Sequence, residues 1–128
     1  IDKFIEGNNS FTFTYIGRHN GNFKNTKIIE PMHGKDLGLE LSKYNIYITG
    51  TKYDPGPNHV LESLACKIPT YALSLGGGAV EFSGIENTYD TFDSLVKILE
   101  SKDYKMNKYT PRSWEECVRD YMEIICQK

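Results

Sequence analysis

Short apolar runs alternate along the chain with segments whose apolar residues recur every three or four positions. Four runs rich in β-branched and aromatic residues end at or near Gly or Pro, and they predict strands at residues 11–16, 27–29, 45–49 and 69–75. Leu37, Leu41 and Tyr44 follow the spacing of a helix, which predicts a helix over residues 35–44. We expect the tyrosines of these elements to lie in the core: Tyr15, Tyr44, Tyr47 and Tyr71.

Capping residues and apolar faces predict three further helices. One begins near Asn58, its expected N-cap, and is expected to bury Val60, Leu61, Leu64 and Ala65. Asp90 is the expected cap of the next, which carries Phe92, Leu95, Val96 and Leu99. Ser113 and Glu116 have the spacing of a capping box. The last helix has an apolar stripe that we expect to lie in the core. Part of the stripe is expected to be exposed if the residues that pack against it belong to missing sequence. The stripe consists of Trp114, Cys117, Val118, Tyr121, Met122 and Ile125.

The alternation of strands and helices is typical of βαβ units, in which strands run parallel and helices cover both faces. We therefore expect an α/β fold with an open, mostly parallel, Rossmann-like sheet, and one domain over residues 1–128. Ligands of such sheets bind at the carboxyl ends of the strands. The site is accordingly expected after positions 16, 29, 49 and 75.

Composition excludes several classes of protein. Of 128 residues, 39% are hydrophobic, and 15 basic residues nearly balance 17 acidic ones, so charge-driven disorder is excluded and nucleic acid is not an expected partner. No apolar run approaches the roughly 20 residues that span a bilayer, and no signal peptide is recognisable. Cys66, Cys117 and Cys126 lack CxxC spacing, which argues against a disulfide framework or zinc site and favours a reducing cytoplasm.

The chain begins with Ile1 rather than Met, at what the pattern predicts to be the end of a helix. We therefore expect it to be part of a longer protein. A cytoplasmic location is expected, with any membrane contact made through the missing part.

The segment from Thr49 to Pro69 carries the most informative chemistry. A buried strand leads into a Pro- and Gly-containing loop, and the helix that follows offers free N–H groups to an anion. Gly56 lets the backbone approach a phosphate closely. Asp54 and Glu62 lie at the two sides of the start of this helix, where carboxylates suit the hydroxyls of a ribose or a sugar. From spacing alone, the simpler explanation is that Asp54 is a turn residue and Glu62 a helix acid favoured by the macrodipole.

Residues 54–62, Asp-Pro-Gly-Pro-Asn-His-Val-Leu-Glu, are followed by Ser-Leu-Ala-Cys-Lys-Ile-Pro. This segment resembles the signature of the group 1 (family 4) glycosyltransferases, in which two acids with seven residues between them precede a small-residue helix ending in Cys-Gly-x-Pro. The strand at 45–49 fits the same pattern. Residues 76–81, Gly-Gly-Gly-Ala-Val-Glu, are similar to the family's Gly-Gly-x-x-Glu segment, and Ser113-Trp114-Glu115 to its closing helix.

The resemblance implies a GT-B enzyme, with this chain as the later portion of its C-terminal donor domain and the N-terminal acceptor domain absent. It implies retaining transfer from a UDP- or GDP-sugar without a metal or another cofactor. Asp54 then lies beside the donor sugar as the catalytic carboxylate and Glu62 holds the ribose. The expected donor-binding residues are Gly56, Pro57, Asn58, His59, Val60 and Glu62.

Two residues depart from the family pattern. Asp54 is one methylene shorter than the usual Glu, so its carboxylate extends less far toward the sugar. Lys67 replaces the Gly after the cysteine. In a left-handed conformation after the helix, Lys costs on the order of 1 kcal/mol relative to Gly.

Several residues have two interpretations. Gly17 and Arg18, with Lys24, are either a diphosphate clamp or loop charges, and Met32 and His33 lie beside a nucleobase or in a solvated loop. His59 either contacts a phosphate or is partly buried and hydrogen-bonded. The run 76–78 is a flexible turn or approaches the sugar. His19 has no partner at metal-ligand spacing, so no metal is expected. Cys66 is expected on the buried side of its helix and inert.

Two other functions compete with glycosyl transfer. Asp in place of Glu and the absent clamp favour a non-catalytic module of the same fold, used for binding or assembly. A sugar-nucleotide epimerase is the third interpretation and fits the 54–62 loop less closely.

Overall fold

The computed structural model describes residues 1–6, 8 and 10–126, and its contacts divide the chain into two compact units, Ile1–Leu39 and Glu40–Lys128. Helix α2 (Gly34–Leu41) includes the boundary between them. The two units are described separately below. The assignment of residues 1–128 to one domain stays a prediction.

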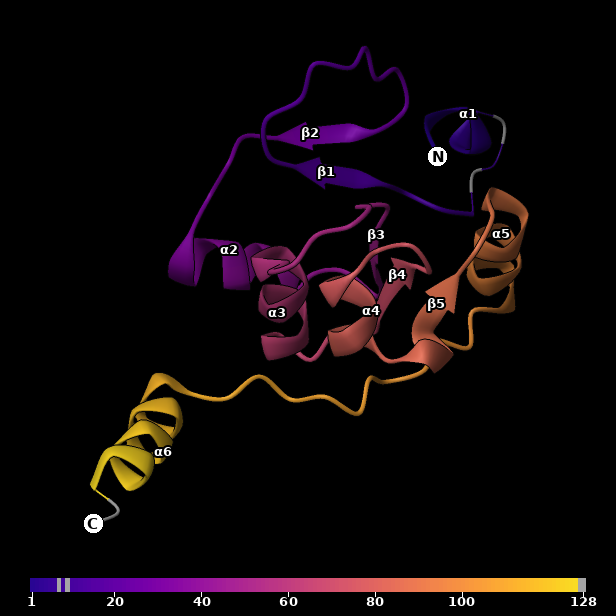
Figure 1. Ribbon diagram of the computed structural model, residues 1–128. Helices are drawn as coiled ribbons and strands as arrows, with labels where there is room; N and C mark the ends of the chain where they lie inside the picture. The colour runs from indigo at the N-terminus through magenta and orange to yellow at the C-terminus, as the bar shows by residue number, and fades with distance from the viewer. Residues whose placement is uncertain (7, 9, 127–128) are drawn as a thin grey trace. The chain divides into compact units, whose positions relative to one another are not determined.

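The first unit contains a short helix and a two-stranded parallel sheet (Figure 1). Its elements are α1 (Asp2–Ile5), β1 (Thr14–Ile16) and β2 (Lys27–Ile29). Thr14 lies opposite Lys27 and Ile16 opposite Ile29. The predicted strand at 11–16 is shortened to its last three residues, because β2 offers only three partners. Tyr15 is 40% exposed, so its assignment to the core was wrong.

The second unit is built on a parallel sheet with the strand order β3-β4-β5, in which β4 is central. The strands are β3 (Tyr47–Thr49), β4 (Thr70–Leu73) and β5 (Thr88–Tyr89). The helices are α3 (Asn58–Ala65), α4 (Gly78–Ser83), the 3-10 turn η1 (Ile85–Asn87), α5 (Phe92–Ser101) and α6 (Trp114–Cys126). The parallel α/β fold is therefore confirmed.

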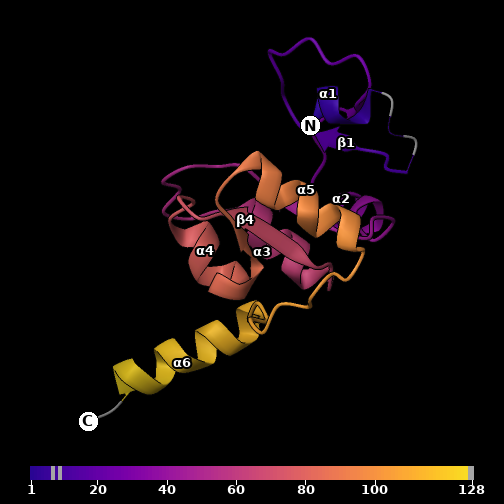
Figure 2. The same cartoon turned by 90° about the vertical axis from the view of Figure 1, so that its right-hand side faces the viewer.

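Helices α3 and α4 contact each other and pack against β4, and α5 packs against β5 (Figures 1 and 2). The core of this unit joins the two helices to the central strand through Val60, Leu64, Ala72 and Ala79, with Phe82 against them. Two details of α3 differ from the prediction. Ala65 is exposed, and Ser63 is buried in its place because its hydroxyl bonds to Thr70 Oγ1 at 2.8 Å.

The cap of α5 is Thr91 and not Asp90, so that prediction was wrong by one residue. The Thr91 hydroxyl accepts the Ser94 N–H at 3.2 Å, and Ser94 Oγ accepts the Thr91 N–H at 3.0 Å. The Asp90 N–H also donates to Ser94 Oγ. This reciprocal pair satisfies two otherwise unpaired N–H groups at the start of the helix.

Helix α3 ends as the sequence predicts, with Lys67 in the left-handed conformation at φ 56°. The Lys67 N–H donates to Leu64 O at 2.9 Å, and the Ile68 N–H donates to Ser63 O at 3.2 Å. These are the two bonds of a Schellman motif, in which Gly is usual. Lys at this position costs about 1 kcal/mol of stability.

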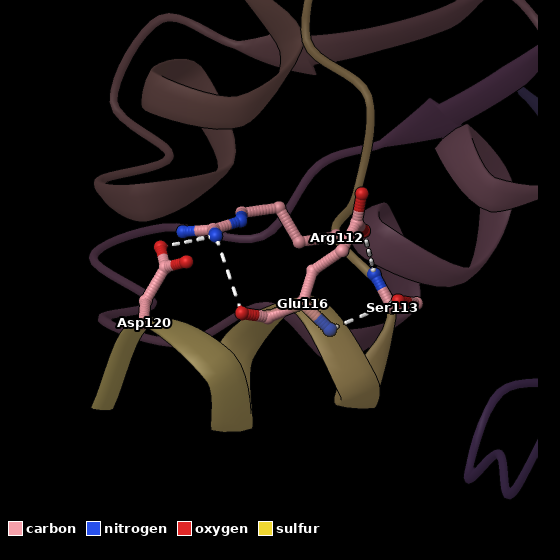
Figure 3. A network of polar contacts seen from close by, with 4 residues as sticks. All are labelled: Arg112, Ser113, Glu116 and Asp120. Atoms are coloured by element: carbon pink, nitrogen blue, oxygen red, sulfur yellow. Dashed lines mark hydrogen bonds and ion pairs between the residues drawn. The ribbon is translucent and has the colours of Figure 1, made fainter. Parts of the chain in front are cut away.

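The capping box of α6 is confirmed (Figure 3). The Ser113 N–H donates to Glu116 Oε2 at 2.7 Å, and the Glu116 N–H donates to Ser113 Oγ at 3.2 Å. These bonds hold the pKa of Glu116 below its usual range. Arg112 pairs with Asp120 across the first turns of the helix. The predicted core position of the apolar stripe is wrong within the described residues, since α6 has no buried residue and Trp114 is 78% exposed.

The described helices include none with the length and apolar character needed to cross a bilayer.

Candidate functional site

Two loops of the second unit leave the same edge of its sheet. Residues 50–57 follow β3 and residues 74–77 follow β4, and these strands are parallel neighbours. The Tyr53 N–H donates to Leu75 O at 3.0 Å, and the Gly78 N–H donates to Asp54 O at 2.8 Å. Asp54 also forms a parallel bridge with Gly77. The loop that carries the candidate acid Asp54 is thus held in place by the glycine run.

The glycine run 76–78 is closely packed. A Cβ on Gly76 would lie 2.8 Å from Leu73 O, and one on Gly78 would lie 3.1 Å from both Asp54 O and Pro55 O. Gly77 has φ 64° and ψ −125°, which L residues rarely adopt. The backbone of this run therefore lies so close to the backbone of neighbouring residues that only glycine fits.

The Asp54 carboxylate takes part in a turn. Its Oδ1 accepts the Gly56 N–H at 3.0 Å, and the side chain is half-buried. This is the geometry of the turn interpretation. The structure describes no hydrogen bond of the second oxygen, Oδ2, which can accept a further donor such as a sugar hydroxyl.

The prediction that Asn58 caps α3 was wrong, because Pro57 holds the N-cap position. Pro57 has φ −76° and ψ 82°, and the Asn58 N–H donates to Gly56 O at 2.9 Å in a three-residue turn around it. Pro57 O accepts the Val60 N–H at 2.9 Å and the Leu61 N–H at 3.3 Å. Within the described part of the chain, only the His59 N–H of this first turn has no acceptor. The expected cluster of free amides is thus largely occupied.

The other expected donor-binding residues offer no side chain to a ligand. Pro57 and Val60 are fully buried, so their side chains belong to the core. Gly56 is exposed, and a Cβ built on it would meet no atom within 4 Å. Space beside Gly56 is therefore open to a ligand.

His59 is half-buried beside the strand that precedes the loop. Its Nε2 lies 3.0 Å from Thr49 Oγ1 and 3.5 Å from Thr51 Oγ1, and its ring packs near that of Tyr47. This geometry fits the hydrogen-bonded interpretation of His59. The sequence offered only a weak signal for the two partners, namely polar residues at the end of a buried strand.

Burial lowers the pKa of His59, and the charges of Asp54 and Glu62 partly oppose this shift. Both carboxylates therefore lie within electrostatic reach of the same ring. Glu62 is exposed one turn into α3, and its carboxylate has no hydrogen bond or ion pair with the described residues. Asp54 precedes α3, and His59 and Glu62 lie three positions apart within it, so all three residues belong to the segment that follows β3.

The lowered pKa of His59 predicts a loss of stability in mild acid. The folded chain favours the neutral ring, so the unfolded chain binds more protons and stability rises with pH. The free energy of unfolding should fall as the pH drops below the ordinary value of 6.5 and level off below the lowered pKa. Urea unfolding at a series of values from about pH 8 to about pH 5 measures this slope. His59→Gln should flatten it; an equal slope in the variant would contradict the assignment.

The remaining candidates belong to the first unit. Gly17 and Arg18 follow β1, and Met32 and His33 follow β2, so both pairs lie at the carboxyl edge of that parallel sheet. Gly17 has φ 136°, and its N–H donates to Ile29 O at 3.0 Å. Arg18 and His33 are exposed and Met32 is half-buried. The other candidates described above all lie in residues 49–78 of the second unit.

Cys66 is half-buried, and burial raises the pKa of its thiol, which keeps it protonated. Across residues 1–6, 8 and 10–126, no group of three or more His, Cys, Asp or Glu side chains is arranged to hold a metal ion.

Comparison with known proteins gives one informative similarity. The chain is 30% identical to a probable sucrose-phosphate synthase of Thermosipho melanesiensis, in an alignment of 95 residues that covers 62% of this chain and 22% of that protein. The chain thus spans about a fifth of the length of this relative, a distant and partial similarity to a glycosyltransferase. No family model matches the chain. No solved structure matches it either.

Proposed function

We propose that this chain is the donor-nucleotide-binding part of a group 1 glycosyltransferase with a GT-B fold. It binds a UDP- or GDP-sugar, and the full protein transfers the glycosyl group with retention to an acceptor held by another domain. The observation that carries the proposal is the placement of Asp54 before α3 and of Glu62 within it, in the segment that leaves the carboxyl end of β3, where parallel α/β sheets bind ligands. The partial similarity to a probable sucrose-phosphate synthase supports the same class.

Each residue has a role that its surroundings allow. Asp54 Oδ2 accepts a hydroxyl of the donor sugar while Oδ1 keeps the loop closed. The exposed carboxylate of Glu62 accepts the two ribose hydroxyls. The diphosphate passes over Gly56, where no side chain intervenes, and meets the His59 N–H. Since only this amide of the first turn is free, most of the phosphate charge is neutralised by basic groups outside residues 49–78.

Titration calorimetry of the chain with UDP- and GDP-sugars tests the proposal. Glu62→Gln removes the charge of the ribose acceptor and should weaken donor binding about tenfold, the usual scale for a hydrogen bond to a charged group. Glu100→Gln changes another exposed acid, on α5, and should leave the affinity unchanged. Absence of binding to both nucleotide sugars, or equal weakening by the two substitutions, would refute the ribose site.

A non-catalytic binding module is the second candidate, favoured by two observations. The Asp54 carboxylate already accepts a hydrogen bond from the Gly56 N–H, and three backbone N–H groups at the start of α3 already have acceptors. Donor affinity that depends on Glu62 and not on Asp54→Asn would favour this candidate. Weakening by both substitutions would favour transfer.

A further inference from the structure

Helix α6 carries an apolar face that the described residues leave uncovered. None of its residues is buried, and Trp114 is 78% exposed. At about 100° per residue, its apolar and sulfur-containing side chains fall within about 160° of the helix surface. We call these side chains the α6 face: Trp114, Cys117, Val118, Tyr121, Met122, Ile124 and Ile125. A wide face that is rich in Trp, Tyr and Met is typical of the centre of a protein interface.

A pocket of about 300 Å³ opens at the C-terminal end of α3. Its walls come from residues 64–68, around the end of that helix, and from residues 106–111, in the segment after α5. Most of the lining is apolar, and Lys67 is the charged residue in it. The pocket has room for one aromatic side chain. Asp54 lies before the other end of α3, so the pocket is separate from the proposed donor site.

The walls of this pocket are fixed by contacts with the core of the second unit. The side-chain amide of Asn107 is hydrogen-bonded to Thr70 and to Ser83 O. The ring of Tyr109 lies 5.0 Å from that of Phe82, measured between centroids. The pocket is therefore formed before any partner arrives, which lowers the entropic cost of binding.

The chain's own α6 is not placed to fill the pocket. Only Arg112 and Ser113 separate the last lining residue, Pro111, from the start of the helix. Both are tied to α6, since Ser113 belongs to the capping box and Arg112 pairs with Asp120 (Figure 3). Reversing the chain takes a turn of about four residues. The connection therefore leaves no turn in which α6 could fold back over the segment that lines the pocket.

The two surfaces have opposite charge. Helix α6 has four acidic residues against one basic, whereas residues 102–112 have four basic against one acidic. Two of these basic residues are already paired, as Lys108–Glu86 and Arg112–Asp120. Lys105, and Lys67 in the pocket, form no ion pair within the described part of the chain. Glu115, which borders the α6 face, forms none there either. An acidic apolar helix thus matches a basic apolar pocket.

We propose that two copies of this chain associate through α6, the α6 face of each copy covering the pocket of the other and Trp114 entering it. A second copy is the partner because each chain supplies both complementary surfaces and cannot join them within itself. Two-fold symmetry makes every contact twice, and a tryptophan held in a fitting pocket supplies much of the energy of an interface. The proposal does not depend on glycosyl transfer and concerns the second unit alone.

Trp114 is the only tryptophan of the chain, so its fluorescence reports the proposed contact directly. As the concentration of the chain rises, sedimentation should show a monomer becoming a dimer. The Trp114 emission should move to shorter wavelength in step with the mass, because the indole leaves water. A chain that stays monomeric, or a dimer in which the emission does not move, would overturn the proposal.

Two substitutions test the two sides of the contact. Trp114→Ala should weaken dimer formation by at least about thirtyfold, the scale of an aromatic anchor. Its control is Tyr53→Ala, at an aromatic residue 75% exposed in the loop after β3, which should have no effect. Lys67→Glu places an acid against an acidic helix and should weaken the dimer about tenfold at low salt. Lys52→Glu, at an exposed lysine of the loop after β3, is its control and should have much less effect.

Circular dichroism of each monomer checks that the variants fold, which is expected because all four side chains are exposed. A loss of dimer in Trp114→Ala with none in Lys67→Glu would refute the pocket, since two α6 faces would then pair with each other. Equal weakening by a variant and its control would refute that side of the contact. Loss in both variants, with both controls unchanged, supports the exchange of α6.

Discussion

Replacing Gly77 with Ala should destabilise the second unit by about 3 to 5 kcal/mol, from backbone strain and overpacking together. Gly77 is the first central residue of a tight turn, with φ 64° and ψ −125° and an Ala79 N–H to Gly76 O bond of 3.3 Å. That turn type requires glycine there. A Cβ would also lie 3.0 Å from Asp54 O and 3.2 Å from Asp54 N. Small domains are stable by only about 5–15 kcal/mol, so much of this unit's stability would be lost.

Urea unfolding followed by circular dichroism measures the loss, and Gly56→Ala is the matched control. Gly56 lies in the same loop region and does not have a positive φ, and a methyl group added to it would meet no atom within 4 Å. Its substitution should change stability by less than about 1 kcal/mol. Similar losses of unfolding free energy in the two variants would mean that the bridge between Asp54 and Gly77 does not hold the loop in place.

Asn107→Asp should destabilise the second unit by about 3 kcal/mol, because it replaces two donated hydrogen bonds with charge facing carbonyls. Asn107 Oδ1 accepts the Thr70 N–H at 2.8 Å, and its Nδ2 donates to Thr70 O at 2.8 Å and to Ser83 O at 2.7 Å. Thr70 and Ser83 are buried. The amide therefore joins the segment after α5 to the start of the central strand and the end of α4.

Asn45→Asp is the control for this change, since Asn45 is exposed and lies before β3. It should alter the free energy of unfolding by less than about 0.5 kcal/mol. The midpoint and slope of urea unfolding report both effects. A loss in Asn107→Asp no larger than that in Asn45→Asp would show that this amide is dispensable.

Much of the local structure could be predicted from the sequence. The strand at 27–29, the helix that begins at Asn58, the left-handed Lys67 and the capping box of Ser113 and Glu116 all depend on neighbours within a few residues. The same holds for the parallel arrangement, because short strands alternating with helices leave little other choice. The positions of Asp54 and Glu62 at the start of α3 follow from the chain itself.

The availability of the site's donors and acceptors could not be predicted. The anion site expected behind Asn58 is largely occupied because Pro57 caps the helix and turns the Asn58 N–H onto Gly56 O. His59 is directed to Thr49 by burial against the strand, ten residues away in the chain. Sequence spacing gives the order of such groups but not which partner each one meets.

By itself, the sequence determined where most strands and helices form, although not α4 or β5, and which residues follow each predicted strand. Only the tertiary structure decided that Gly77 crosses Asp54 and that Asn107 ties down Thr70, contacts between residues 23 and 37 positions apart. Helix propensities, caps and turns act over three or four residues, whereas these contacts exist only after parallel strands have paired in one register. Tertiary packing therefore decides which donors and acceptors of the candidate site are already hydrogen-bonded and which remain open to a ligand.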